Sequence, residues 1–280
     1  MHRYARGALT IFAALLAGLL AMGACSCSSQ TESTRDSDGG AAAASSDESL
    51  PQIKIGTSYL EPFFYMGRDG EYAGIDAEIA KEACRRAGLA PDFVEIQWGD
   101  RDESLEDGAV DCIWSGFAIN GRESEYLWTD AYLDTDLALL VADRSPIASL
   151  EDFSGPGGIA VRAGSIAEQV LLEGGTPIPS GVDIHCYGTS EMAKSAFAKG
   201  FTDGWVSYRL VLDQVAKESP GRYRYLSESL YTLHLGVAFK RGYTGPYYRQ
   251  INDALASMKQ DGTLAQIVAR YANEEAGDEN

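Results

Sequence analysis

The residues of this 280-residue chain that could hold a metal ion or act as nucleophiles are few and scattered. Beyond the first ten residues the histidines are His185 and His234, and no group of histidines and cysteines has the spacing of a metal site. A zinc site or a histidine-based triad is therefore not expected. We expect no metal, no cofactor and no catalytic residue.

The cysteines of the central part of the chain lie in apolar stretches. Cys84 is on the apolar stripe of an expected helix, and Cys112 and Cys186 are in short strand-like runs. We expect all three to be small buried hydrophobic residues. In an oxidising compartment, a disulfide between Cys84 and Cys112 is the alternative.

Cys25 has a different setting, at the end of a leader sequence. Two arginines precede an uncharged apolar run over 8–22, which is shorter than the roughly 20 residues of a membrane span and has the size of a signal-peptide core. The run ends in Met22-Gly23-Ala24-Cys25, which resembles a bacterial lipoprotein signal. The resemblance implies a signal peptide at 1–24, a lipid on Cys25, and an extracytoplasmic protein anchored to the membrane. The alternatives are an ordinary cleaved signal, an uncleaved anchor, or lipidation of Cys27.

The segment 25–50 and the overall charge restrict the possible partners. The segment is rich in Ser, Ala, Gly, Asp and Glu, so it cannot bury enough apolar surface to fold, and we expect a flexible tether. The formal net charge of the chain is −18. This acidity argues against binding of nucleic acid or of anionic lipid surfaces, both of which need basic patches.

The remaining chain alternates between strand and helix patterns. Strands are expected at 52–57, 92–96, 110–115, 137–142, 158–161, 182–187, 204–207 and 235–240. Helices are expected at 76–87, 104–107, 165–172, 190–198, 246–258 and 263–271, with Asp76 as an N-cap and Gly88 as the stop of the first. This order predicts an α/β fold with mainly parallel sheets covered on both faces.

Two α/β lobes would account for this order if the chain crosses out near 137–142 and returns near 235–240. The predicted division is 51–138 with 236–273 for the first lobe and 139–235 for the second. A disordered tail is expected at 274–280.

Several segments in this order resemble the family-3 extracellular solute-binding proteins, the polar amino-acid receptors of ABC importers. They include IKIGT, DGEYAGIDAEIAKEACRRAGL, VDCIWSGFAINGRESEYLWTDAYL, SLEDFSGPGGIAVRAGSIAE, GVAFKRG and MKQDGTLAQIVARYA, and they span nearly all of 51–273. The resemblance implies the two-lobed, periplasmic-binding-protein-like (type II) fold with two hinge-crossing strands. It also implies a ligand site between the lobes.

The resemblance places the first-lobe part of this site in the segment leading into Arg122. Arg122 matches the arginine that binds the ligand's α-carboxylate, and a planar guanidinium can make two parallel charge-assisted bonds to such a group. Ser115, Gly116, Phe117 and Ala118 match the segment whose backbone and hydroxyl groups hold the ligand. The family often has Ser or Thr in place of Ala118, so one side-chain bond is lost here.

Further positions carried over from the family lie on both lobes. Trp98 matches the aromatic wall of the site, and Arg162 matches a variable position that faces the distal group of the ligand. The turn Gly164-Ser165-Ile166 opens a helix, whose N–H groups and dipole suit a carboxylate. A hydroxyl often found at the Ile166 position is absent.

The acidic residues that usually pair with the ligand's ammonium group are missing. Their places hold Tyr208 and either Ser58 or Tyr59. Because a desolvated ammonium without a partner is costly, we expect a neutral or acidic ligand to bind better than lysine or arginine. The alternative is that Glu61, or another carboxylate, turns into the cleft.

The expected function is capture of a small polar ligand, an amino acid or related carboxylate, by a monomer that delivers it to the transmembrane permease of an ABC importer. Two alternatives remain. One is a sensing module for a membrane receptor. The other is a periplasmic dehydratase-like enzyme on the same fold, for which Glu61 is the candidate general acid.

Overall fold

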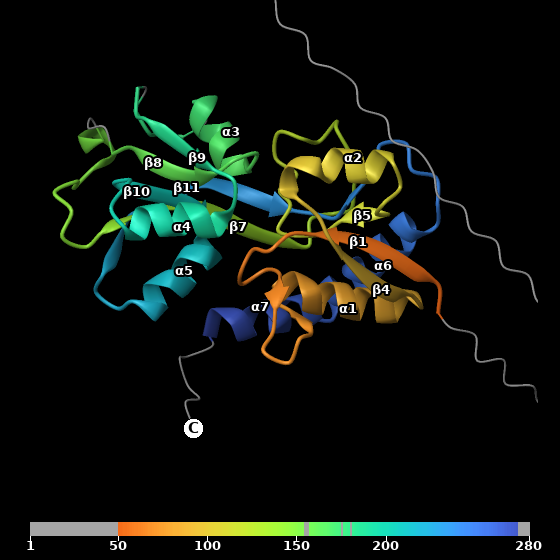
Figure 1. Ribbon diagram of the computed structural model, residues 1–280. Coiled ribbons are helices and arrows are strands. Elements are labelled where there is room, and N and C mark those ends of the chain that lie inside the picture. Colours follow the sequence, from red (N-terminus) through yellow and green to blue (C-terminus); the bar gives the residue numbers. More distant parts are fainter. Residues whose placement is uncertain (1–49, 154–156, 175, 180, 274–280) are drawn as a thin grey trace, which may run out of the picture. The chain divides into compact units, whose positions relative to one another are not determined.

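The computed structural model describes residues 50–153, 157–174, 176–179 and 181–273, and it arranges them in two lobes, each with its own five-stranded sheet (Figure 1). The predicted signal peptide, the predicted lipidation site Cys25, the predicted tether up to residue 49 and the predicted tail 274–280 lie outside the described residues. The chain passes from the first sheet to the second between β6 and β7, and it returns between β11 and β12.

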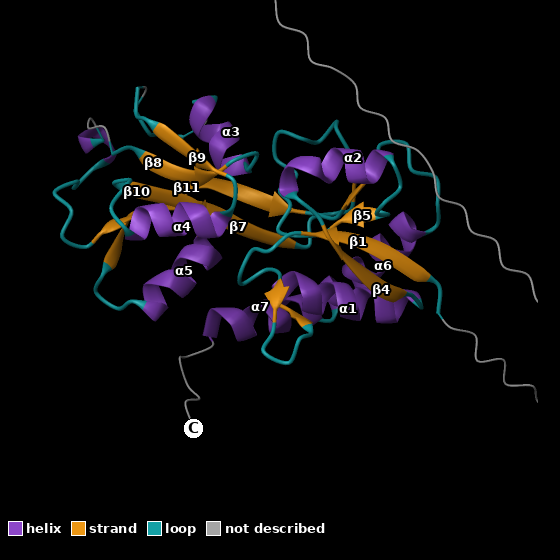
Figure 2. Cartoon of the chain, in the orientation of Figure 1, coloured by secondary structure: helices purple, strands orange, loops and turns teal. Residues whose placement is uncertain are grey.

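The first sheet has the strand order β4-β1-β5-β12-β6. Its strands are β1 (Gln52–Thr57), β4 (Ala90–Glu95), β5 (Cys112–Ile113), β6 (Leu127–Trp128) and β12 (Ala238–Phe239). The same lobe contains the hairpin β2 (Tyr65–Met66) and β3 (Tyr72–Ala73), the 3-10 turn η1 (Trp98–Asp100), and the helices α1 (Ile75–Ala87), α2 (Arg101–Glu106), α6 (Tyr247–Gln260) and α7 (Thr263–Asn273). Helix α1 packs against α6 and α7, whereas α2 lies on the other side of the sheet (Figure 2).

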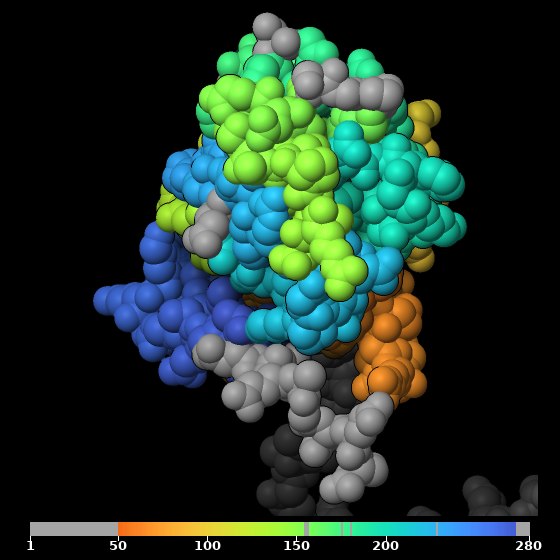
Figure 3. Space-filling model, turned by 90° about the vertical axis from the view of Figure 1, so that its left-hand side faces the viewer, coloured from red at the N-terminus to blue at the C-terminus, as the bar shows by residue number. Residues whose placement is uncertain are grey.

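The second sheet has the order β11-β7-β10-β8-β9. Its strands are β7 (Leu133–Ala142), β8 (Ile159–Arg162), β9 (Ile184–Tyr187), β10 (Gly204–Tyr208) and β11 (Tyr223–Leu235). The turn η2 (Leu150–Asp152) and the helices α3 (Ile166–Leu172), α4 (Ser190–Ala198) and α5 (Arg209–Glu218) complete this lobe. Second-lobe residues, coloured green to light blue, form much of the face seen in Figure 3.

The predicted α/β class and two-lobed fold are confirmed, but the expectation of mainly parallel sheets is wrong. β4, β1 and β5 are parallel in the first sheet, and β10, β8 and β9 in the second. β12 runs antiparallel to both of its neighbours, and β7 runs antiparallel to β10 and β11. The antiparallel strands lie next to the two places where the chain crosses between the lobes. A strand that enters or leaves a lobe at a crossing is not part of a βαβ unit, which would make it parallel to its neighbour.

The start of α1 differs from the prediction. Gly74 (φ +114°), and not Asp76, is the N-cap, and the Asp76 side chain makes no cap hydrogen bond. A Cβ at Gly74 would collide with the carbonyl oxygen of Phe63, so only glycine fits. Asp76 therefore lies two residues after the cap, in the first turn of the helix, where its side chain is buried. The predicted stop at Gly88 is confirmed, with φ +69°.

Among the longer elements, α5 and most of β11 were not predicted; the short elements β2, β3, β6, η1 and η2 were not predicted either. β11 pairs with β7 over a long stretch, but its register shifts between Tyr225 and Ser227 and again before Tyr231. These irregularities interrupt the alternating pattern that would reveal a strand. The strand expected at 235–240 is in fact the end of β11 followed by β12. Gly236 separates them, and a Cβ there would lie 2.9 Å from the Ile119 side chain.

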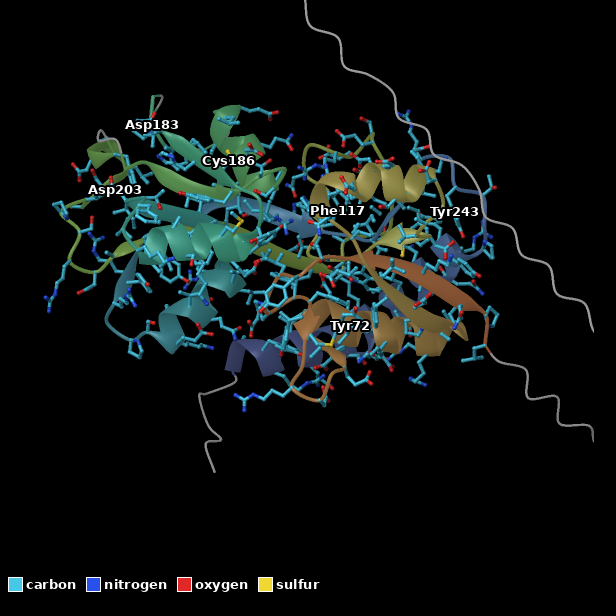
Figure 4. All side chains as sticks on the ribbon, in the orientation of Figure 1. Tyr72, Phe117, Asp183, Cys186, Asp203 and Tyr243 are labelled. Carbon is cyan, nitrogen blue, oxygen red and sulfur yellow. The ribbon has the colours of Figure 1, made fainter. Side chains whose placement is uncertain are left out.

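The cysteines agree with the prediction in two cases of three. Cys84 and Cys112 are buried free thiols in the first-lobe core. Cys186 is exposed, so its expected burial is wrong. It lies on β9, the edge strand of the second sheet, beside α3 (Figure 4). Of the helices in the described part of the chain, none is long and apolar enough to cross a membrane.

Candidate functional site

Three arginines surround a pair of aromatic rings where the lobes meet. Trp98 and Phe117 pack edge to face with ring centroids 4.9 Å apart. The guanidinium carbons of Arg162 and Arg101 lie 4.5 Å and 5.1 Å from the Trp98 centroid, and that of Arg122 lies 5.5 Å from Phe117. Each distance is within the range of a cation–π contact. Figure 4 labels Phe117, close to where the ribbons of the two lobes meet.

Arg122 and Arg162 are buried cations without a counterion. Their residues are 6% and 8% exposed, and neither guanidinium makes a hydrogen bond or ion pair with any residue that the structure describes. Burial lowers the pKa of both side chains, and the nearby charge of Arg101 lowers the pKa of Arg122 further. An unpaired buried cation is unfavourable, so these two positions are prepared for an anion that the protein itself does not supply.

Arg101 is partly engaged within its own lobe. Its Nη1 donates to the Trp98 carbonyl (2.9 Å), and Nη2 lies 3.7 Å from Asp102 Oδ2. Its Nε is buried and has no hydrogen-bond partner. Arg101 was not predicted as a site residue. It stands three positions after Trp98 where a helix begins, and this spacing would have placed it beside the ring.

Several hydrogen bonds join residues of the two lobes, and two of them lie beside the arginines. Trp98 Nε1 donates to the Gly164 carbonyl (3.0 Å), and the Tyr208 hydroxyl donates to the Gly116 carbonyl (2.7 Å). At the periphery, Gln214 Nε2 donates to Glu61 Oε1 (3.1 Å). The predicted site residues Trp98, Gly116 and Tyr208 thus lie at the junction of the lobes, although 66 and 92 positions separate Trp98 and Tyr208 from their bonded partners.

The Gly116 turn is held by Asp76. Gly116 has φ +58°, its N–H donates to Asp76 Oδ2 (2.5 Å), and the Tyr132 hydroxyl donates to Asp76 Oδ1 (2.8 Å). Burial raises the pKa of Asp76 to about 7, and the hydrogen bonds from Gly116 and Tyr132 oppose this rise. A buried carboxyl that sequence analysis assigned to a helix cap therefore fixes the segment leading into Arg122.

The hydroxyl of Ser115 is engaged within the protein. Its Oγ accepts from Ser58 N–H (3.1 Å) and donates to the Ser58 carbonyl (2.7 Å). The Ser58 hydroxyl is buried without a partner. Ala118 is buried and bridges to Leu235. The ligand contacts of Ser115, Gly116, Phe117 and Ala118 stay predictions.

The second-lobe turn uses part of its donors internally. Gly164 N–H donates to Glu168 Oε2 (2.6 Å), and Ser165 N–H donates to the Arg162 carbonyl (3.3 Å). The Ser165 hydroxyl donates to the same carbonyl (2.6 Å) and accepts from Glu168 N–H, so it caps α3. Ile166 is buried. The predicted anion contacts of Ser165 and Ile166 remain untested predictions.

A small cavity opens beside Arg162 and Trp98. Its volume is about 100 Å³. Its lining includes Ser58, Tyr59, Trp98, Arg162, Thr189 and Glu191. Tyr59 is 44% exposed, and its hydroxyl donates to Glu61 Oε2 (3.0 Å). Burial is the main reason why the pKa of Tyr208 rises to about 12, so this residue remains a neutral hydroxyl donor.

The fold and this geometry define a class of protein. Two α/β lobes close on a buried cationic site with an adjoining cavity, which is the arrangement of a binding protein for a small solute.

The comparisons identify the family. The model of the bacterial extracellular solute-binding proteins, family 3, matches residues 53–274, and the chain belongs to this family. The L-cystine-binding protein TcyA of Bacillus subtilis (strain 168) is 26% identical over 230 residues, which cover 80% of this chain and 82% of that protein. The histidine-binding periplasmic protein of Escherichia coli (strain K12) is 27% identical over 233 residues, which cover 79% and 88%.

Solved structures agree on the fold. An ancestral arginine-binding protein bound to glutamine superposes with a TM-score of 0.71 at 24% identity, covering 80% of this chain and 98% of the other. An ancestral amino acid-binding protein described as a precursor of cyclohexadienyl dehydratase gives a TM-score of 0.68 at 24% identity, covering 79% and 94%. The predicted family and general function are confirmed: this is an extracytoplasmic solute-binding protein, which captures a small ligand and delivers it to an ABC importer.

Proposed function

We propose that this chain binds an amino acid between its lobes, with Arg122 on the α-carboxylate, and delivers it to the transmembrane permease of an ABC importer. Relatives named for binding L-cystine, histidine, or lysine, arginine and ornithine support an amino-acid ligand. Loss of the solvation of a carboxylate is offset when a buried guanidinium binds it through two charge-assisted hydrogen bonds.

The state of Arg122 carries this proposal. It is 6% exposed, it lacks a partner among the described residues, and its ring contact with Phe117 orients the guanidinium. A buried cation of this kind is unfavourable in the free protein and becomes favourable when an anion enters. Trp98 and Tyr59 would then contact the body of the ligand, and Arg162 its distal end.

The cellular arrangement is also proposed. A lipid on Cys25 would anchor the protein outside the cytoplasm, and the segment 25–50 would let the folded part reach its permease. The lobe limits proposed are 51–138 with 236–273 and 139–235, and the protein would act as a monomer.

We favour transport over sensing and over catalysis. Glu61, the candidate general acid, accepts hydrogen bonds from Tyr59 and Gln214 on its two carboxyl oxygens. In this arrangement both carboxyl oxygens are engaged within the protein. Closure of the two lobes about their connections would present the loaded form to the permease.

A ligand screen tests the proposal. Amino acids are added singly to the full chain, and the melting temperature is measured, because a ligand that binds the folded state alone raises it. At least one amino acid should raise the melting temperature of the wild type and not that of Arg122→Ala. An amino acid that stabilises both proteins equally would remove Arg122 from the site.

The control for this screen is Arg144→Gln. Arg144 is exposed and lies outside the site, so this variant loses the same charge and should respond as the wild type does. If no amino acid shifts the melting temperature of the wild type, the proposed ligand class is wrong.

A further inference from the structure

We infer that the ligand carries two carboxylates and that Arg101 and Arg162, on the two sides of the lobe junction, bind the second one beside Trp98. The inference rests on the proposed function, which assigns the first carboxylate to Arg122. The ligand class is thus a small solute with two carboxylates, either an acidic amino acid or a dicarboxylic acid.

The two arginines reach Trp98 from different lobes. Arg162 ends β8 of the second lobe, and Arg101 begins α2 of the first. Both guanidinium carbons lie within about 5 Å of the indole centroid, at 4.5 Å and 5.1 Å. Arg101 Nη1 also reaches the second-lobe turn, where it lies 3.8 Å from the position that a Cβ of Gly164 would take.

Donors on both guanidinium groups remain available. Arg162 lines the cavity and has no hydrogen-bonded or ion-paired partner among the described residues. The buried Nε of Arg101 also lacks a partner. A carboxylate placed between the two groups could accept from both, whereas an amide would satisfy neither charge.

The nearby carboxyl groups do not neutralise this cluster. Both oxygens of Asp76 are taken by Gly116 and Tyr132, and both oxygens of Glu61 by Tyr59 and Gln214.

Four other acidic residues come near the arginines, and all four are exposed. Asp102 approaches Arg101 at 3.7 Å, but its own side chain is 58% exposed. Glu95 and Glu191 line the cavity and are exposed, without an ion pair to Arg162, and the charge of the exposed Glu125 acts on Arg122. Because solvent screens these exposed carboxylates, they offset the three guanidinium charges only in part, and a second ligand carboxylate would offset them further.

Calorimetric titration of the full chain with matched ligands tests the inference. Glutamate and glutamine differ by one carboxylate at nearly equal shape, and glutarate has both carboxylates without the amine. We expect glutamate or glutarate to bind at least about tenfold more tightly than glutamine. The ratio of glutamate to glutarate then tells an acidic amino acid from a dicarboxylic acid.

Arginine variants locate the second carboxylate. Arg162→Gln should weaken the binding of the two-carboxylate ligand roughly 30-fold or more, and Arg101→Gln roughly tenfold, while glutamine binding changes less than about threefold. Arg162→Lys keeps the charge and should retain part of the preference. Arg144→Gln should leave all affinities unchanged.

Folding is checked by the melting temperature without ligand. Arg162→Gln should melt close to the wild type, because removal of a buried charge without a counterion offsets the loss of the cation–π contact with Trp98. If that variant fails to fold, the Arg162→Lys and Arg101→Gln titrations decide in its place.

Two outcomes would overturn this inference and leave the proposed function intact, and a third would overturn both. Tight binding of glutamine, lysine or arginine with weaker binding of both two-carboxylate ligands overturns the inference alone. The same holds for a preference for two carboxylates that survives in Arg101→Gln and Arg162→Gln. If Arg122→Ala binds every ligand as the wild type does, the proposed function fails as well.

Discussion

The buried carboxyl of Asp76 predicts an unusual dependence of stability on pH. Asp76 is 1% exposed, and burial raises its pKa to about 7 from an ordinary value of 3.8. The folded protein therefore holds a proton on this group over a pH range in which the unfolded chain has released it. Stability from this group is full below pH 3.8 and is lost as the pH rises toward 7.

The substitution Asp76→Asn isolates this effect. The amide oxygen can accept from Gly116 N–H, and the amide nitrogen can donate to the Tyr132 oxygen, so both contacts of the carboxyl keep a counterpart. The amide carries no charge, and its burial does not depend on pH. The free energy of unfolding of the variant, relative to the wild type, should therefore increase between pH 4.5 and pH 8.

The size of this increase follows from the two pKa values. Because one pKa unit corresponds to about 1.4 kcal/mol, the full difference is about 4 kcal/mol, of which roughly 3 kcal/mol falls between pH 4.5 and pH 8. Urea unfolding of both proteins at several pH values measures it. Asp143→Asn, at an exposed aspartate, serves as the control and should show a much smaller change.

Two results would refute this reasoning. A difference between Asp76→Asn and the wild type that does not change with pH would mean that burial leaves the carboxyl unperturbed. A variant that becomes relatively less stable as the pH rises would mean that the hydrogen bonds from Gly116 and Tyr132 outweigh the cost of burial.

Three further predictions concern the site and the anchor. Arg122→Ala should weaken ligand binding by roughly 2–5 kcal/mol in calorimetry, since the ligand carboxylate loses its buried partner. Arg122→Lys should recover part of the lost binding free energy. An unchanged affinity in a folded Arg122→Ala variant contradicts the assignment. Tyr208→Phe should lower the free energy of unfolding by about 1–3 kcal/mol in urea, because the Gly116 carbonyl loses its donor across the lobes, and a neutral effect would show that water replaces the hydroxyl. Cys25→Ser should release the protein from the membrane fraction on cell fractionation; a variant that is still processed and still partitions with the membrane argues for another anchor.

Much of the local structure could be predicted from the sequence because local signals agree with it. The apolar stripe of α1 ends at Gly88, α4 occupies the predicted residues 190–198, and β1 the predicted 52–57. The signals failed where tertiary contacts intervene. The register shifts of β11 interrupt the alternating pattern by which a strand is recognised. Helix α1 starts at Gly74 because a Cβ there would collide with the Phe63 carbonyl, and no local pattern reveals this contact.

The candidate site divides in the same way. The segment around Arg122 could be recognised from the residues beside it in the sequence. The sequence also showed that Tyr208 stands where the family usually has an acidic residue. Arg101 was missed because an arginine at the start of a short helix usually faces solvent. Here the packing of Trp98 against Phe117 brings the guanidinium over the ring.

The sequence by itself determined the family, the α/β pattern and the kinds of charge available to a ligand, because each is a property of residues close together in the chain. The tertiary structure decided which of these charges meet. Trp98 bonds to Gly164, 66 positions away, and Tyr208 bonds to Gly116, 92 positions away. Such contacts arise only when two sheets formed from distant segments pack together, and it is their packing that leaves Arg122 and Arg162 buried without a counterion.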